Sequence, residues 1–139
     1  MNKIDHIGIA VKDLEKSNAL FAKLLGTPHY KIEEVESEKV RTSFFKTGDS
    51  KIELVEASNP ESAIALFIEK HGEGMHHIAF DVDDIEKETE RLKAEGFVPT
   101  GSGKPFRGAD NKLVIFFHPK TTNGVLIELC QEIKTDDRQ

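Results

Sequence analysis

The sequence predicts an α+β fold in which two βαβββ modules form a shared, curved, mixed β-sheet with the helices on its outer side. Two observations predict it. A segment near the start of the chain recurs about half a chain later, and each copy is followed by a helix-like stretch and three strand-like stretches. The length of 139 residues, with 37% apolar and 32% charged side chains, suits one globular domain.

The repeat becomes visible when HIAFDVDDI, residues 77–85, is placed over HIGIAVKDL, residues 6–14, at an offset of 71 residues. His, Ile, Val and Asp coincide, and Leu corresponds to Ile. Each segment begins as a short strand and passes at an Asp into a charged stretch with apolar residues at helical spacing. We therefore expect one module over about residues 4–57 and a second over about 75–132, within one domain of residues 1–139.

The helix of each module has recognisable ends. In the first module Asp13 is a suitable N-cap and Gly26 a suitable end. In the second, Asp83 and Glu86 resemble a capping box and Gly96 ends the helix. The expected apolar residues of the first helix are Leu14, Phe21, Leu24 and Leu25, and those of the second are Ile85 and Leu92.

Strand-like stretches follow each helix. They are expected at roughly 29–36, 39–47 and 50–56 in the first module, and at roughly 97–101, 112–118 and 124–131 in the second. Between the modules, Asn59-Pro60 is expected to open a connector helix over about 59–72, with Pro60 at its first position and Ile64, Phe67 and Ile68 on one face.

Polar residues interrupt these strands at matched places. Side chains alternate along a strand, so His6 shares a face with Gly8, and His77 shares a face with Ala79. The last strand of each module carries an acid between two aliphatic residues, as Ile52-Glu53-Leu54 and Ile127-Glu128-Leu129. If the aliphatic side chains face the helices, both carboxylates point to the face that carries the histidines.

A single strand histidine is most often a hydrogen-bonded core or surface residue, and a single glutamate is usually solvated. Two His/Glu pairs at matched places change this interpretation, because buried imidazoles and carboxylates either bind a metal or carry a large desolvation cost. Glu53, Glu128, His6 and His77 are therefore the candidate metal ligands.

Composition excludes several classes. A net charge of −6 without a basic cluster argues against nucleic acid, and no apolar run is long enough to span a membrane. The N-terminus has no signal-peptide pattern, and the single Cys130 cannot form an internal disulfide, so a cytoplasmic location is expected. Cys130 is interpreted as a packing residue. Structural roles are expected for the remaining histidines, which are His29, His71, His76 and His118.

The modules, with His early and Glu late, resemble the vicinal oxygen chelate superfamily. Within it the chain is similar to methylmalonyl-CoA epimerases over nearly its full length, on the segments IDHIGIAV, KIELVEA, GMHHIAFDV and KLVIFFHPKTTNGVLIEL. The resemblance implies a homodimer that interconverts (R)- and (S)-methylmalonyl-CoA by abstracting the C2 proton. It also implies a divalent cobalt, manganese, nickel or zinc ion, bound by His6, His77 and Glu128, with Glu53 at a fourth position where relatives carry Gln or Glu.

The resemblance makes Glu128 one acid/base for the epimerisation. The second acid/base of the family has no counterpart here, because Thr42 and Ser37 stand where relatives carry Glu. Glu53, the repeat counterpart of Glu128, is the expected substitute. Candidate cations for the coenzyme A phosphates are Lys104, Arg107, Lys112 and Lys120.

Three other interpretations share this fold. A glyoxalase-like lyase would act on a glutathione adduct, and an extradiol dioxygenase would need iron and oxygen. A metal-free module would only sequester a small molecule, and the paired histidines and glutamates argue against it.

Overall fold

The computed structural model describes residues 1–134, in which the chain forms two compact units. The first unit is His6–His76, and the described part of the second unit is residues 77–134 together with Met1–Asp5. The expected single domain of residues 1–139 includes 135–139, which lie outside the described residues, and it stays a prediction.

The first unit contains a four-stranded mixed sheet. Its strands have the order β2-β3-β4-β1, in which β1 and β4 are parallel and the other neighbours are antiparallel. The elements are β1 (Lys3–Ala10, from His6 onward in this unit), α1 (Leu14–Leu25), β2 (Lys31–Val35), β3 (Val40–Thr47), β4 (Ser50–Ala57) and α2 (Ala63–His71). A short 3-10 turn, Glu36–Glu38, joins β2 to β3. Helix α1 packs on one face of this sheet, where Leu14, Phe21 and Leu25 meet Leu54 and Phe45.

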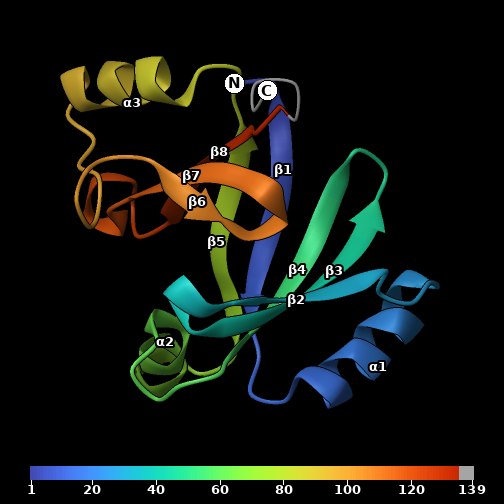
Figure 1. Ribbon diagram of the computed structural model, residues 1–139. Helices are drawn as coiled ribbons and strands as arrows, with labels where there is room; N and C mark the ends of the chain where they lie inside the picture. The colour runs from blue at the N-terminus through green and yellow to red at the C-terminus, as the bar shows by residue number, and fades with distance from the viewer. Residues whose placement is uncertain (135–139) are drawn as a thin grey trace. The chain divides into compact units, whose positions relative to one another are not determined.

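The second unit repeats this arrangement with the strand order β5-β8-β7-β6, in which β5 and β8 are parallel. Its elements are β5 (Gly74–Asp81, from His77 onward in this unit), α3 (Ile85–Ala94), β6 (Phe106–Gly108), β7 (Lys112–Phe117) and β8 (Leu126–Glu132), with 3-10 turns at Ala109–Asn111 and Pro119–Thr121. Figure 1 shows α3 beside the strands of this unit, and its Ile85 and Leu92 pack against Ile115, Phe117 and Leu129.

The register confirms the repeat that the sequence predicts. In the first unit Gly8 lies opposite Glu53, and in the second Ala79 lies opposite Glu128. Gly8 and Ala79 are 71 residues apart, which is the offset of the sequence repeat. The pairing of β1 with β4 is therefore equivalent to the pairing of β5 with β8. The predicted fold class, α+β with two βαβββ modules, is confirmed.

One predicted strand is wrong. The stretch 97–101 forms only a single bridge, Pro99 to Phe117, and the first strand after α3 is β6 at Phe106–Gly108. Proline has no N–H to donate to a ladder, and Gly101 and Gly103 turn the chain with positive φ. Regular strand pairing resumes only after this turn, where β6 pairs with β7.

Several predicted helix details also need correction. The N-cap of α3 is Asp84, whose side chain accepts from the Lys87 N–H, not Asp83. Helix α2 begins at Ala63 with Ser62 as its N-cap, because Asn59 instead accepts from the Glu61 N–H in a preceding turn. Leu24 is 71% exposed and does not belong to the apolar stripe of α1. Asp13 and Gly26 cap α1 as predicted.

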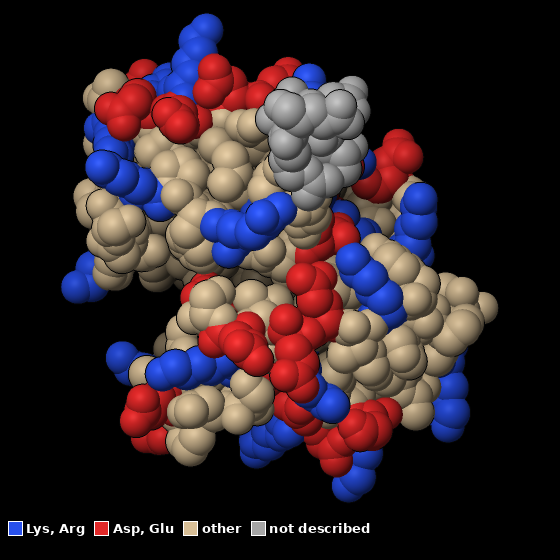
Figure 2. Space-filling view, viewed as in Figure 1, with Lys and Arg blue, Asp and Glu red and all other residues tan. Residues whose placement is uncertain are grey.

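Among the described residues, no helix has both the length and the apolar character needed to cross a bilayer. On the face in view in Figure 2, lysine and arginine side chains are interspersed with aspartate and glutamate, and the described residues there form no broad basic area.

Candidate active site

The first unit contains a buried pair of His6 and Glu53. His6 Nδ1 lies 3.1 Å from Glu53 Oε2, and the two side chains are only 6% and 7% exposed. They come from neighbouring parallel strands, β1 and β4. The sequence therefore places an imidazole and a carboxylate in contact where almost no solvent reaches them.

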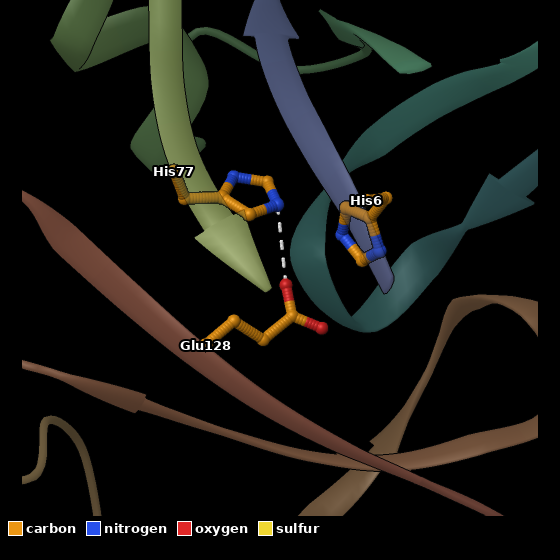
Figure 3. A group of neighbouring side chains, drawn as sticks. All are labelled: His6, His77 and Glu128. Atoms are coloured by element: carbon orange, nitrogen blue, oxygen red, sulfur yellow. Dashed lines mark ion pairs between the residues drawn. The ribbon is translucent and has the colours of Figure 1, made fainter. Parts of the chain in front are cut away.

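The second unit contains the equivalent pair, His77 and Glu128. Figure 3 shows the imidazole from β5 and the carboxylate from β8 pointing toward each other, with His77 Nε2 3.1 Å from Glu128 Oε1. Both side chains are again buried. Each predicted site residue thus lies in a His/Glu pair, one pair in each unit.

The strand pattern explains why these polar groups are buried. Ile52 and Leu54 pack toward α1, and Ile127 and Leu129 pack toward α3, so the intervening glutamates must point to the opposite face. On that face each glutamate lies opposite a small residue of the parallel strand, Gly8 or Ala79. The predicted orientation of both glutamates is confirmed.

A repeated phenylalanine adjoins each glutamate, and sequence reasoning missed it. Phe44 lies opposite Glu53, and Phe116 lies opposite Glu128, each on the antiparallel neighbour strand. The Phe116 ring stands at 88° to the His77 ring, with centroids 5.7 Å apart. The signal in the sequence was the matched pair Phe44-Phe45 and Phe116-Phe117, each just before a module's last strand.

These donors fit a divalent ion. Imidazole nitrogen and carboxylate oxygen form the mixed ligand set that several divalent transition metals accept, and each of the four side chains offers one such atom. Burial beside a phenylalanine lowers the local dielectric, which makes an unneutralised carboxylate costly. The residues present are therefore compatible with a bound cation.

The two positions where the resemblance implies a second acid/base lie outside the His/Glu pairs. Thr42 is buried on β3, opposite Val55, and Ser37 lies exposed in the 3-10 turn Glu36–Glu38. Neither side chain is a carboxylate, so neither can serve as an ordinary acid/base at neutral pH.

One of the four candidate phosphate-binding cations must be corrected. Lys112 does not extend into solvent but is buried, with Nζ 2.7 Å from Asp5 Oδ1. Lys104, Arg107 and Lys120 are exposed on the second unit, and Arg107 donates to Asn111.

Cys130 and the remaining histidines have structural positions. Cys130 is fully buried with Ala79 and Val114, and burial, reinforced by the charges of Asp5 and Glu128, raises the pKa of its thiol. His71 and His76 lie against the Phe67 ring, and His29 lies against Phe45. His118 caps a 3-10 turn through the Lys120 N–H.

Comparison with known proteins identifies the family. Residues 5–116 match the model of the glyoxalase/bleomycin resistance protein/dioxygenase superfamily. The chain is 39% identical to an ethylmalonyl-CoA/methylmalonyl-CoA epimerase of Cereibacter sphaeroides, over 94% of this chain and 98% of that protein. It is also 39% identical to an uncharacterised protein of Bacillus subtilis, over 94% and 93% of the two chains.

A solved structure shares the fold. The crystal structure of methylmalonyl-CoA epimerase from Mycobacterium tuberculosis superposes with a TM-score of 0.91 at 29% identity, over 99% of this chain and 92% of that one. The likeness extends over both units.

Proposed function

The chain belongs to the methylmalonyl-CoA epimerase family of the glyoxalase/bleomycin resistance protein/dioxygenase superfamily, and we propose that it interconverts (R)- and (S)-methylmalonyl-CoA by proton exchange at C2. Its membership of this family makes it an epimerase. The observation that carries the proposed reaction is the pair of buried His/Glu contacts at equivalent places in the two units.

The reaction demands a particular set of groups. The C2 proton lies between a thioester and a carboxylate, and its removal leaves an enolate whose charge develops on the thioester oxygen. Inversion requires that a proton leave from one face of C2 and return from the other, so an acid/base is needed on each side.

Glu128 and Glu53 are the proposed acid/base pair. They occupy equivalent positions in the two modules, each opposite a small residue and beside a phenylalanine. Two equivalent carboxylates related by the repeat are suited to opposite faces of one planar enolate. Glu53 takes this role because Thr42 and Ser37, where the resemblance implies an acid, are not carboxylates.

His6, His77, Glu128 and Glu53 are the proposed ligands of one divalent ion, of cobalt, manganese, nickel or zinc. When bound, such an ion supplies positive charge where the enolate charge develops. Each carboxylate has two oxygens. Glu128 Oε1 and Glu53 Oε2 each face a histidine, so the second oxygen of each carboxylate can accept or return the C2 proton.

Assembly as a homodimer is proposed from the family, and a cytoplasmic location is proposed from the single cysteine of the chain. Size-exclusion chromatography with light scattering tests the dimer, and a monomer at micromolar concentration would contradict it.

Deuterium wash-in at C2 tests the reaction. Methylmalonyl-CoA of each configuration is incubated with the enzyme in heavy water, and both exchange and inversion are followed before and after treatment with a chelator. We expect exchange together with inversion, lost on chelation and restored by a divalent ion. Turnover of a glutathione hemithioacetal in place of methylmalonyl-CoA would show a lyase instead.

The same assay separates the two carboxylates. Glu53→Gln and Glu128→Gln should each abolish inversion, yet each should leave exchange from the one epimer whose proton faces the remaining carboxylate. Glu34→Gln, an exposed acid of β2, is the matched control and should behave as the unaltered enzyme. Full inversion by Glu53→Gln would remove Glu53 from the mechanism.

A further inference from the structure

Lys31, the first residue of β2, lies over the ring of Phe44. Its Nζ is 4.6 Å from the ring centroid. The Phe44 side chain is fully buried, while the lysine side chain remains 38% exposed. The lysine stem therefore covers an apolar ring while its ammonium stays within reach of water.

The sheet register places this cation on the face of the acid/base. Lys31 lies opposite Phe44 on β3, and Phe44 lies opposite Glu53 on β4. Directly opposite residues of neighbouring strands point to the same face. Lys31, Phe44 and Glu53 thus form one row across three adjacent strands, and the ammonium lies above the middle residue of that row.

The opposite face of the same sheet has a different role. Phe45, the neighbour of Phe44, packs with Leu14 and Leu54 under α1. Lys31 therefore lies on the sheet face opposite α1, which is the face to which Glu53 also points.

The proposed substrate brings several negative charges to a chain with a net charge of −6. Its acyl group ends in a carboxylate, and coenzyme A carries phosphates. Lys112, one of the cations that the sequence suggested for this purpose, is in a buried pair with Asp5. A cation on the same sheet face as Glu53 is therefore of value for binding the substrate.

We propose that Lys31 is a specificity-determining residue that binds an anionic oxygen group of the thioester substrate on the Glu53 face of the first unit. This inference rests on the proposed function. The anionic group is either the carboxylate of the acyl group or a phosphate of coenzyme A, since an ammonium recognises both through the same charge-assisted hydrogen bond.

The contact that Lys31 makes with Glu33 is compatible with this role. Lys31 Nζ lies 3.8 Å from Glu33 Oε1, and Glu33 is itself about one-third exposed. An exposed ion pair of this length is weak and is screened by salt. A substrate anion can therefore displace this contact with Glu33 at small cost.

The test compares Lys31→Met, Lys31→Arg and the unaltered enzyme on two substrates. Methionine keeps an unbranched apolar stem over Phe44 but removes the charge, and arginine keeps the charge. The substrates are methylmalonyl-CoA and methylmalonyl-pantetheine, which retains the carboxylate but lacks the coenzyme A phosphates. Lys23→Met removes the same charge from an exposed position on α1 and is the matched control.

We expect Lys31→Met to lower kcat/KM for methylmalonyl-CoA by about tenfold to a hundredfold, mainly through KM, as for loss of a charge-assisted hydrogen bond. Lys31→Arg should restore most of this loss, and Lys23→Met should match the unaltered enzyme. The decline of kcat/KM with added potassium chloride should also be shallower in Lys31→Met. An equal loss on both substrates assigns the carboxylate, and a loss confined to methylmalonyl-CoA assigns the phosphate.

Unchanged KM and unchanged salt dependence in Lys31→Met, on both substrates, would overturn the inference. Equal losses in Lys31→Met and Lys31→Arg would also overturn it, because the packing on Phe44 and not the charge would then be responsible. Failure of the proposed function is recognised separately, since the unaltered enzyme would then exchange and invert neither substrate. Thermal melting of each variant confirms that the fold is retained.

Discussion

At the scale of single residues, Asp5 and Lys112 form a buried ion pair in the second unit. The two side chains are 3% and 11% exposed, and their charged atoms are 2.7 Å apart. Removing one member leaves the other charged and desolvated, so we expect Lys112→Met to lower the free energy of unfolding by about 3–5 kcal/mol. Urea denaturation measures this loss.

The exposed pair of Arg41 and Glu15 provides the control for this prediction. Its N–O distance is 3.0 Å, but the Glu15 side chain is 77% exposed. Glu15→Gln should therefore change the free energy of unfolding by less than about 1 kcal/mol. The double variant Asp5→Asn, Lys112→Met should recover part of the loss, and equal losses in the buried and exposed pairs would contradict the role of desolvation.

A second residue-scale prediction concerns Thr89 of α3. Its hydroxyl is buried without a hydrogen-bond partner among the described residues, and its repeat counterpart Asn18 of α1 has a side-chain oxygen in the same state. Thr89→Val removes the desolvated hydroxyl at nearly constant shape, so stability should rise by about 1 kcal/mol. Thr100→Val, which deletes a hydroxyl bonded to the Phe116 carbonyl, should instead be destabilising in the same denaturation assay.

At the scale of elements, α3 provides a test of helix capping. Asp84 accepts from the Lys87 N–H at 3.1 Å, whereas Asp83 accepts from the Asn2 side chain. Asp84→Ala should cost about 1 kcal/mol of stability, because an N-cap is lost, and Asp83→Ala should cost less than about 0.5 kcal/mol. Thermal melting of the two variants distinguishes them, and a larger cost at Asp83 would restore the cap that the sequence suggested.

Element types were predictable where a periodic pattern was long, and element ends were not. The strand of residues 97–101 failed because Pro99 and the glycines after it limit pairing to one bridge. The connector helix started later than expected because Ser62 offers an N-cap with its own accepted hydrogen bond. Such competition between neighbouring caps depends on backbone geometry that no local pattern contains.

The sequence also did not predict a hydrogen bond between helix and sheet that occurs once in each module. Glu56 of β4 accepts from the Leu14 N–H at the start of α1, and Gln131 of β8 accepts from the Ile85 N–H at the start of α3. Both lie three residues after the proposed acid/base glutamate. Each module thus ties the first turn of its helix to its last strand, a contact across 42 or 46 residues of sequence.

At the scale of the whole molecule, the repeat made the candidate site predictable. His6, His77, Glu53 and Glu128 were identified because each has a counterpart at the same place in the other module. Lys31 has no such counterpart, and its position over Phe44 follows only from strand register. Lys112 was misjudged because its partner Asp5 is 107 residues away in sequence.

The division of the proposed ligands between the two modules leads to a prediction about stability. An ion that binds only the folded chain stabilises it by RT ln(1 + [ion]/Kd), which is about 2.7 kcal/mol at an excess of a hundredfold over Kd. For a chain of this length that corresponds to a rise in Tm of roughly 10 °C. Differential scanning calorimetry of chelator-treated protein, with and without added cobalt, manganese, nickel or zinc, measures the rise without any assay of activity.

His6→Ala and His77→Ala should each abolish most of that rise, although the two residues belong to different modules. His71→Ala, at the exposed end of α2, should keep it in full. If both ligand histidines serve one ion, the double variant should lose no more of the rise than either single variant, because the first substitution already removes the binding that the second would weaken. If two independent ions bind, one at each His/Glu pair, each single variant should lose only part of the rise in Tm, and the two losses should add. That result would contradict one shared metal centre and indicate two separate ones.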